Sequence, residues 1–272
     1  MVRRARVDAE LVRRGLARSR EHAVELINAG RVLIAGSPAS KPATAVEPNT
    51  PLLVREIPDE TEWASRGAHK LLGALAAFEP AGLAVAGRRC LDAGASTGGF
   101  TDVLLHCGAR EVVAVDVGYG QLIWRLRNDE RVRVHDRTNV RSLGPEDIGG
   151  QVDLVVADLS FISLGLVLPA LAACAAPGAD LAPMVKPQFE VGKERVGSGG
   201  VVREPELRAA AVRGVAQAAA RHGLSTLGAV ASPLPGPSGN VEYFLWLRAG
   251  APARSDDEVA RMIDQAVQEG PQ

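Results

Sequence analysis

The chain of 272 residues carries 31 Lys and Arg against 32 Asp and Glu, and 46% of its residues are hydrophobic. This content is enough to bury one or two cores, as in a soluble globular protein. The near-neutral balance excludes a global basic field, so any attraction to nucleic acid must be local. Three scattered cysteines exclude a disulfide framework and a zinc site. No apolar run reaches membrane-spanning length, so we expect a cytoplasmic monomer with no bound metal and no membrane partner.

Residues 1–56 have a basic composition that the whole-chain balance hides. Apolar spacing predicts a helix from Val7, and Ser19 is a suitable N-cap for a second helix. Short strands are expected near residues 32–34 and 52–54. The pattern fits a small domain whose arginines are either simply solvated or placed to bind RNA phosphates.

A polar linker is predicted over residues 57–66, and an α/β domain over residues 67–272. Strand-like and helical segments alternate there, which indicates a Rossmann-like doubly wound sheet with helices on both faces. The last two strands are expected to form a hairpin at one edge of the sheet. The predicted strands lie near residues 88–92, 111–115, 131–135, 152–157, 179–185, 224–230 and 241–247.

The segment RRCLDAGASTGGFT, from Arg88 to Thr101, joins a buried strand to a helix through small residues. Such a turn lets the backbone approach a ligand closely, and the amides at the helix start can donate to it. The letters G-x-S-x-G around Ser96 match a nucleophile elbow, but the motif stands on the first strand of its domain. A dinucleotide site is disfavoured because G-x-G-x-x-G does not occur. A pocket for S-adenosylmethionine remains.

In that pocket, an acidic residue at the end of the second strand is suited to hold the two ribose hydroxyls of a nucleoside. We expect the first turn to line the methionine half of the cofactor and a later loop to contact its adenine. The residues in question are Asp92, Gly94, Ser96 and Gly98 for the methionine half, Asp116 for the ribose, and Asp136 for the adenine.

The type of methyl acceptor is indicated by the residues that follow the central strands, where ligands bind in such sheets. Enzymes that alkylate exocyclic base nitrogens place prolines and an aromatic after the acidic residue, whereas Leu159 and Ser160 follow Asp158. Enzymes that alkylate a pyrimidine carbon need a cysteine nucleophile, and Cys174 lies in a helical stretch. A ribose hydroxyl needs only a proton acceptor and an oriented oxygen, which lysines and carboxylates can provide.

Two resemblances sharpen these predictions. The stretch RVDAELVRRGLARSREHAVELINAGRVLIAG resembles the S4 RNA-binding domain. With the motifs SRGAHKL, LDAGASTGGFTDVLL, DVGYGQL, DLVVADLSFISL, VKPQFEVGKE and SGNVEYFLWL, nearly the whole chain resembles the TlyA or haemolysin A-like family, which joins an S4 domain to an FtsJ-like methyltransferase domain. The first resemblance implies phosphate contacts by Arg4, Arg6, Arg18, Arg20 and Lys41. The second implies a catalytic tetrad of Lys70, Asp158, Lys186 and Glu242.

The family resemblance implies methyl transfer from S-adenosylmethionine to ribose 2′-oxygens of cytidines in 16S and 23S ribosomal RNA, on which susceptibility to capreomycin and viomycin depends. Lys186 would accept the hydroxyl proton, while Asp158 and Glu242 orient the two lysines. Ribosomal RNA or ribosomal subunits are the expected partners. Two alternatives stay open, a membrane-active haemolysin and a ribosome-binding factor without catalysis. Without the family match, the four charged residues would fit ordinary ion pairs at strand ends equally well.

Overall fold

The computed structural model describes residues 4–17, 19–55, 62–236 and 238–271. The chain divides into two compact units, Met1–Glu62 and Trp63–Gln272. Residues 57–61 of the predicted linker lie outside the described part. The residues just after it belong to the second unit, because the Ala64 amide donates to Asp102 Oδ2 at 2.8 Å.

The N-terminal unit packs two short helices against small antiparallel sheets. Ser19 begins the second helix as predicted, since its hydroxyl accepts a hydrogen bond from the His22 amide at 3.1 Å. Val7, Leu11 and Ile27 are buried in its core. One sheet has the order β3-β2-β5 and the other pairs β1 with β4. The elements are β1 (Ala5–Arg6), α1 (Val7–Arg13), α2 (Arg20–Asn28), β2 (Val32–Ile34), β3 (Ser37–Pro38), β4 (Ala45–Val46) and β5 (Leu52–Val54).

The C-terminal unit is built on a seven-stranded sheet of order β11-β12-β10-β9-β6-β7-β8. Strands β6 to β10 run parallel, whereas β12 is antiparallel to both β10 and β11. This confirms the Rossmann-like sheet and the hairpin at its edge. The strands are β6 (Arg89–Ala93), β7 (Glu111–Val115), β8 (Val132–His135), β9 (Val152–Ala157), β10 (Ala175–Val185), β11 (Leu224–Ala231) and β12 (Tyr243–Ala249).

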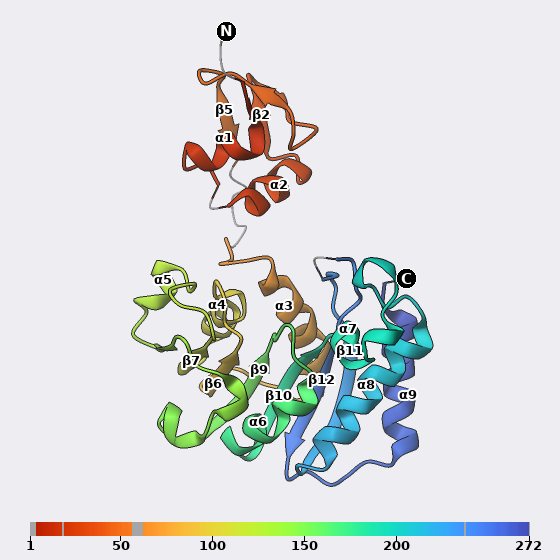
Figure 1. The fold of residues 1–272 in the computed structure, drawn as a ribbon. Helices are drawn as coiled ribbons and strands as arrows, with labels where there is room; N and C mark the ends of the chain where they lie inside the picture. The colour runs from red at the N-terminus through yellow and green to blue at the C-terminus, as the bar shows by residue number, and fades with distance from the viewer. Residues whose placement is uncertain (1–3, 18, 56–61, 237, 272) are drawn as a thin grey trace. The chain divides into compact units, whose positions relative to one another are not determined.

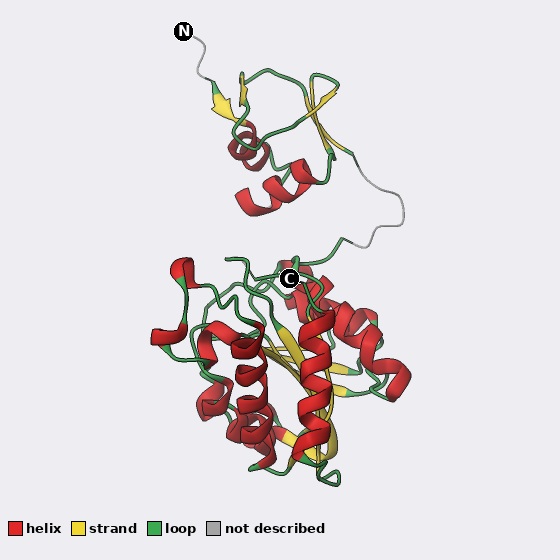
Figure 2. Cartoon of the chain, turned by 90° about the vertical axis from the view of Figure 1, so that its right-hand side faces the viewer, coloured by secondary structure: helices red, strands yellow, loops and turns green. Residues whose placement is uncertain are grey.

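Helices cover both faces of this sheet (Figures 1 and 2). One face of the central strands packs with α3 (Gly67–Phe78), α4 (Gly99–His106) and α5 (Trp124–Arg127). The other face packs with α6 (Leu168–Cys174), α8 (Pro205–Ala220) and α9 (Asp256–Glu269). None of the described helices is long and apolar enough to cross a membrane.

One edge of the sheet collects the functional residues. Parallel strands all end on the same side, so the loops after β6, β7, β8, β9 and β10 meet there. The antiparallel β12 begins on that side, which brings the residue before it, Glu242, to the same place. The short helix α7 (Pro187–Glu190) follows β10 directly.

Candidate active site

Two ion pairs, buried except for the partly exposed Asp158, contain all four residues of the predicted tetrad. Lys70 Nζ, on α3, lies 2.5 Å from Glu242 Oε2, and Lys186 Nζ lies 2.6 Å from Asp158 Oδ1. Lys70, Glu242 and Lys186 are buried, with 6%, 1% and 8% of their surface exposed. Each pair balances its own charge, which is the condition for keeping ionised groups inside a protein.

The strand register brings the two pairs together. Strands β10 and β12 are antiparallel with Val185 opposite Tyr243, so the next step along the ladder places Lys186 opposite Glu242. Residues that face each other in this way point to the same side of a sheet, with Cβ atoms typically about 5 Å apart. The tetrad therefore forms one row, from Lys70 through Glu242 and Lys186 to Asp158.

Ser160 was not assigned a role from the sequence, yet its hydroxyl accepts a hydrogen bond from Lys186 Nζ at 2.9 Å. The lysine is thus held by two oxygens of the loop after β9. Glu242 Oε1 is buried and accepts no hydrogen bond from the described residues. An oxygen of this kind is an available acceptor for a ligand hydroxyl.

The turn after β6 lies directly beside this row. Gly94 adopts a left-handed conformation, with φ of +89°, and a Cβ atom there would collide with the carbonyl oxygen of Asp158. Glycine is needed for both reasons. Gly98 also has positive φ, but a Cβ atom there would meet the side chains of Leu122 and Leu126, so its neighbours point to a packing role.

Asp92 stands fully buried at the end of β6. Its Oδ2 accepts a hydrogen bond from the Thr101 hydroxyl at 2.7 Å, while Oδ1 has no hydrogen-bond partner among the described residues. Burial raises the pKa of Asp92 to about 7, the Thr101 bond opposes that rise, and the charge of Asp158 adds to it. A buried carboxylate in this state is suited to a cationic ligand group.

Asp116 ties the first turn to the next loop. Its two carboxylate oxygens accept hydrogen bonds from the backbone amides of Ser96, at 2.8 Å, and Gly118, at 2.7 Å. Ser96 has φ of +48° and an exposed side chain. Ser96 and Asp116 therefore lie side by side, and the Asp116 carboxylate is ordered by the protein backbone.

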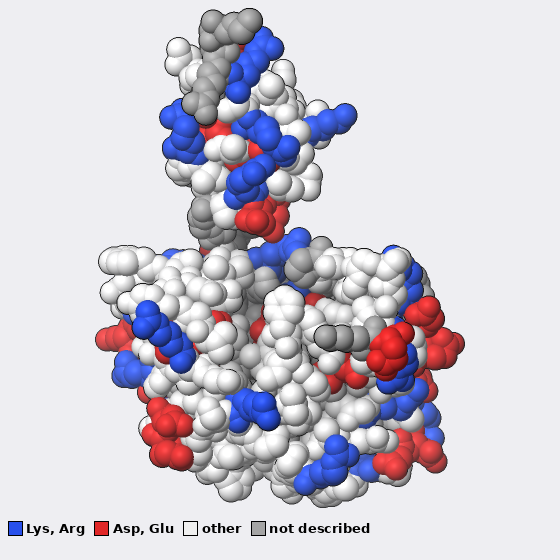
Figure 3. Space-filling view, in the orientation of Figure 1, with Lys and Arg blue, Asp and Glu red and all other residues white. Residues whose placement is uncertain are grey.

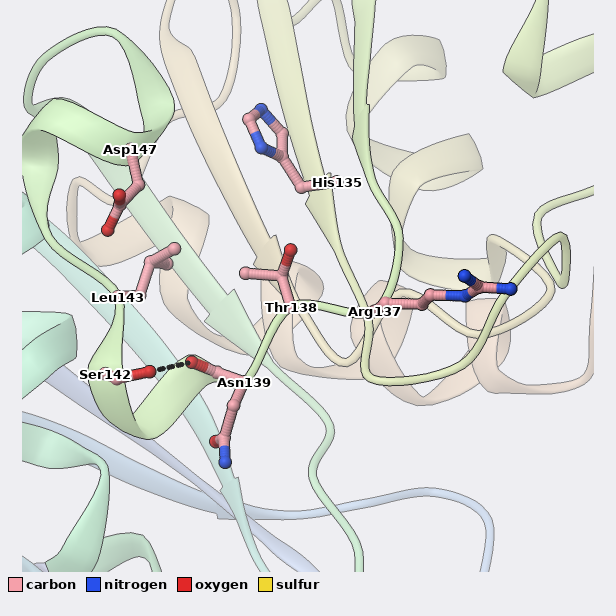
Figure 4. Close-up of a pocket in the computed structure, with 7 residues that line it drawn as sticks. All are labelled: His135, Arg137, Thr138, Asn139, Ser142, Leu143 and Asp147. Carbon is pink, nitrogen blue, oxygen red and sulfur yellow. Dashed lines mark hydrogen bonds between the residues drawn. The ribbon is translucent and has the colours of Figure 1, made fainter.

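The third predicted cofactor loop lies beside this one, because the Thr138 amide donates to the Asp116 carbonyl at 2.9 Å. Asp136 forms an ion pair with Arg127 at 2.6 Å. An open pocket of about 400 Å³ adjoins the loop, and Figure 4 shows its lining. It contains neither Asp136 nor any tetrad residue, and is formed by His135, Arg137, Thr138, Asn139, Ser142, Leu143 and Asp147.

In the N-terminal unit, the buried Asp8 pairs with two of the arginines that are predicted to contact phosphates. Arg6 lies 2.7 Å and Arg20 3.1 Å from Asp8 Oδ2, and both arginine side chains remain more than half exposed, at 52% and 58%. The hydrogen bond from Arg6 lowers the pKa of Asp8 to about 2, and that from Arg20 adds to the effect. One carboxylate thus fixes two exposed guanidinium groups side by side.

Of the other predicted contacts, Arg4 pairs with Glu47 at 3.4 Å, Lys41 is exposed, and Arg18 lies outside the described residues. Figure 3 shows basic side chains spread over the visible face of this unit. The positions suit backbone contact with a polyanion.

Comparison with known proteins decides the family. The model of the FtsJ-like methyltransferases matches residues 63–249, and that of the S4 domain matches residues 5–52. The chain is 65% identical, over 272 residues and all of both chains, to the 16S/23S rRNA (cytidine-2′-O)-methyltransferase TlyA of Mycobacterium tuberculosis. It belongs to the TlyA family.

Two further members of the comparison extend this result. YqxC of Bacillus subtilis, a candidate rRNA methyltransferase, is 40% identical over 270 residues, covering 97% of this chain and 94% of its own. A structure from Streptococcus thermophilus, described as a candidate hemolysin, is 38% identical with a TM-score of 0.75, covering 99% and 98% of the two chains.

The cofactor of this TlyA-family chain is S-adenosylmethionine, and the site fits it. Asp92 Oδ1 is buried without a hydrogen-bond partner among the described residues, so it is an available acceptor for the ammonium group of the cofactor. Among the described residues, no cluster of three or more His, Cys, Asp or Glu is placed to hold a metal ion.

Gly94→Ala is expected to weaken S-adenosylmethionine binding at least tenfold, because the added methyl group collides with the Asp158 backbone beside the tetrad. The matched control is Gly82→Ala, where φ is +107° but no atom lies within 4 Å of the added Cβ. Both variants carry backbone strain of about 1 kcal/mol. Titration calorimetry measures the binding, and equal affinities for the two variants would contradict the role of Gly94.

Proposed function

We propose that the protein transfers a methyl group from S-adenosylmethionine to the 2′-oxygen of cytidine ribose in 16S and 23S ribosomal RNA. The observation that carries this proposal is the row of two lysines and two carboxylates beside the cofactor turn. The relative that is 65% identical over its whole length is named for this activity. Deprotonation of a hydroxyl is the task such a row is suited to.

Bound S-adenosylmethionine supplies an electrophilic methyl group, and the chain's own residues prepare the oxygen. We assign Lys186 as the acceptor of the 2′-hydroxyl proton, a task that its Nζ performs as the neutral amine, after releasing its own proton to solvent. Asp158 and Ser160 hold its Nζ in place, at 2.6 and 2.9 Å. Lys70 keeps Glu242 ordered, and the open Glu242 Oε1 accepts a hydrogen bond from the ribose. Asp92, Gly94 and Ser96 bind the methionine half of the cofactor, Asp116 its ribose and Asp136 its adenine, while Gly98 shapes the turn by packing against Leu122 and Leu126.

An RNA substrate is further supported by two features outside the row. The N-terminal S4 domain presents exposed arginines on Asp8. Beside the tetrad, Phe161 exposes 91% of its surface, and its ring centroid lies 5.4 Å from that of Phe189. Exposed aromatic rings near a site that acts on RNA are suited to stacking with unpaired bases.

The two alternative functions have less support. The described helices give no support to a membrane-active haemolysin, since none of them is long and apolar enough to span a membrane. A ribosome-binding factor without catalysis would not need two buried lysine–carboxylate pairs against a cofactor turn. Burying such pairs gives little net stability, so their presence favours a chemical role.

The direct test is methylation of purified ribosomal subunits, with modified sites mapped by reverse-transcription stops at low nucleotide concentration. We expect new stops at cytidines with the parental protein. Lys186→Ala should lower the rate at least about 100-fold, because a general base contributes roughly 10²- to 10⁴-fold. S-adenosylmethionine binding should persist.

The control for this experiment is Arg213→Ala on α8, which removes an exposed ion pair with Asp264 far from the row in sequence. It should act at the parental rate. Methylation by Lys186→Ala near the parental rate would show that Lys186 is not the base. A parental protein that labels neither subunit would refute the proposed function.

The state of Asp92 gives a pH-dependent prediction. Its pKa is raised to about 7, so it is largely protonated at pH 6.5 in the free protein. The cofactor's amino group is still cationic at that pH, and its approach favours the carboxylate. Binding at pH 6.5 should therefore release most of a proton, and affinity should rise as the pH increases from 6 to 7.

Calorimetry in two buffers of different ionisation heat measures that proton. Asp92→Asn, which has the same shape but cannot ionise, should release none and should bind more weakly. The same proton release from Asp92→Asn would assign the effect to another group, and no release from the parental protein would argue against contact between Asp92 and the cofactor.

Replacing both Arg6 and Arg20 by alanine should weaken binding to ribosomal RNA. It should also reduce the magnitude of the slope of log K against log salt by roughly 1.4, since each lost phosphate contact on a single strand contributes about 0.7. Filter binding at several salt concentrations measures the slope. Arg213→Ala serves as the control, and an unchanged slope for the double variant would exclude the two arginines from the RNA interface.

A further inference from the structure

A glutamate outside the tetrad binds the far end of the loop that carries Asp158. Glu190 is the last residue of α7, the short helix that follows Lys186. Its Oε2 accepts a hydrogen bond from the Ser163 hydroxyl at 2.6 Å, and its Oε1 accepts one from the Leu164 amide at 2.8 Å. No role was assigned to Glu190 from the sequence.

The loop after β9 is thereby tied at both ends to one short segment. Lys186 contacts Asp158 and Ser160 near the start of the loop, at 2.6 and 2.9 Å. Glu190 contacts its end. Lys186 directly precedes α7 and Glu190 ends it, so one short segment makes both contacts with the loop.

The backbone of this loop needs such restraint. Phe161, between the two anchors, has φ of +63°, a left-handed conformation that non-glycine residues keep only when their surroundings hold it. Its ring contacts that of Phe189 on α7, but 91% of the surface of Phe161 is exposed. Packing around Phe161 is therefore sparse, so the loop depends mainly on its hydrogen bonds to Lys186 and Glu190 for a fixed conformation.

The surroundings of Glu190 act on it in two opposite ways. Burial raises the pKa of Glu190, and the hydrogen bonds from Ser163 and the Leu164 amide oppose that rise. The same carboxylate supports η4 (Leu164–Leu166), the single turn that leads into α6. Both oxygens of Glu190 are used, so its side chain has one position relative to the loop.

We propose that Glu190 is a positioning residue, which fixes the loop of Asp158 and Ser160 against Lys186 so that the proton acceptor is aligned before RNA binds. Glu190 touches neither the reacting oxygen nor the methyl group in this proposal. It acts through the loop and through Lys186. The inference rests on the proposed methyltransferase function and adds a residue to it.

The test compares Glu190→Ala with Glu190→Gln in single-turnover methyl transfer to ribosomal subunits. Glutamine has the same length, accepts from the Leu164 amide through its oxygen, and can donate to Ser163 Oγ through its nitrogen. We expect the alanine variant to lose at least tenfold in the methyl-transfer rate, because small misplacements at a reacting centre have effects of this size. The glutamine variant should stay within about threefold of the parental rate.

Two further readouts separate positioning from general stability. The affinity for S-adenosylmethionine and the half-saturating concentration of subunits should stay within about twofold in Glu190→Ala, since the loss lies in alignment. Glu206→Ala, an exposed glutamate in the first turn of α8, is the control and should match the parental protein in every measurement. If Glu190→Ala fails to fold, Ser163→Ala removes one of the two bonds and should slow methyl transfer about threefold or more.

The outcomes are distinguishable. Parental rates in both Glu190→Ala and Ser163→Ala, or a lower melting temperature with an unchanged rate per folded molecule, would overturn the positioning role. Equal losses of methyl-transfer rate in the alanine and glutamine variants would assign the effect to the charge of Glu190, which would also overturn the positioning role. A parental protein that is itself inactive in the assay would refute the proposed function, which is a separate result.

Discussion

The site depends on the pairing of two lysines with two carboxylates at one edge of the sheet. An unpaired lysine or carboxylate in this position would lose its hydration without compensation, at a cost of several kcal/mol. Lys70 with Glu242 and Lys186 with Asp158 avoid that cost pairwise, at 2.5 and 2.6 Å. Two neutral pairs then lie in one row, so the site holds four ionised groups with no net charge.

The topology of the sheet makes this row possible. Asp158 and Lys186 follow neighbouring parallel strands, whose ends coincide at one edge. Glu242 comes from the opposite end of its strand, because β12 runs antiparallel to β10 and begins where β10 stops. A shift of one residue in that register would turn the side chain of Glu242 to the other face of the sheet and leave Lys70 buried alone.

Much of this arrangement could be predicted from the sequence, for reasons that differ between residues. Asp92, Asp116, Asp158 and Lys186 each follow an apolar run, and the rule that ligands bind beyond strand ends places them together. Glu242 precedes its strand, so only the family motif pointed to it. Its contact with Lys70 joins residues 172 positions apart, which no local pattern encodes. Ser160 and Glu190 were missed because their roles exist only as contacts between two loops.

The cofactor turn and the tetrad depend on each other through a single close approach. Gly94 lies against the Asp158 backbone so closely that no side chain fits between them. The Asp158 amide also donates to the Ala93 carbonyl at 3.0 Å, which fixes the start of the acceptor loop to the end of β6. The place where the methyl donor binds and the place where the hydroxyl proton is taken are therefore parts of one rigid edge. The folded chain itself therefore aligns the site of the methyl donor with the group that accepts the proton. The binding energy of the RNA is then needed only to place the ribose at that edge.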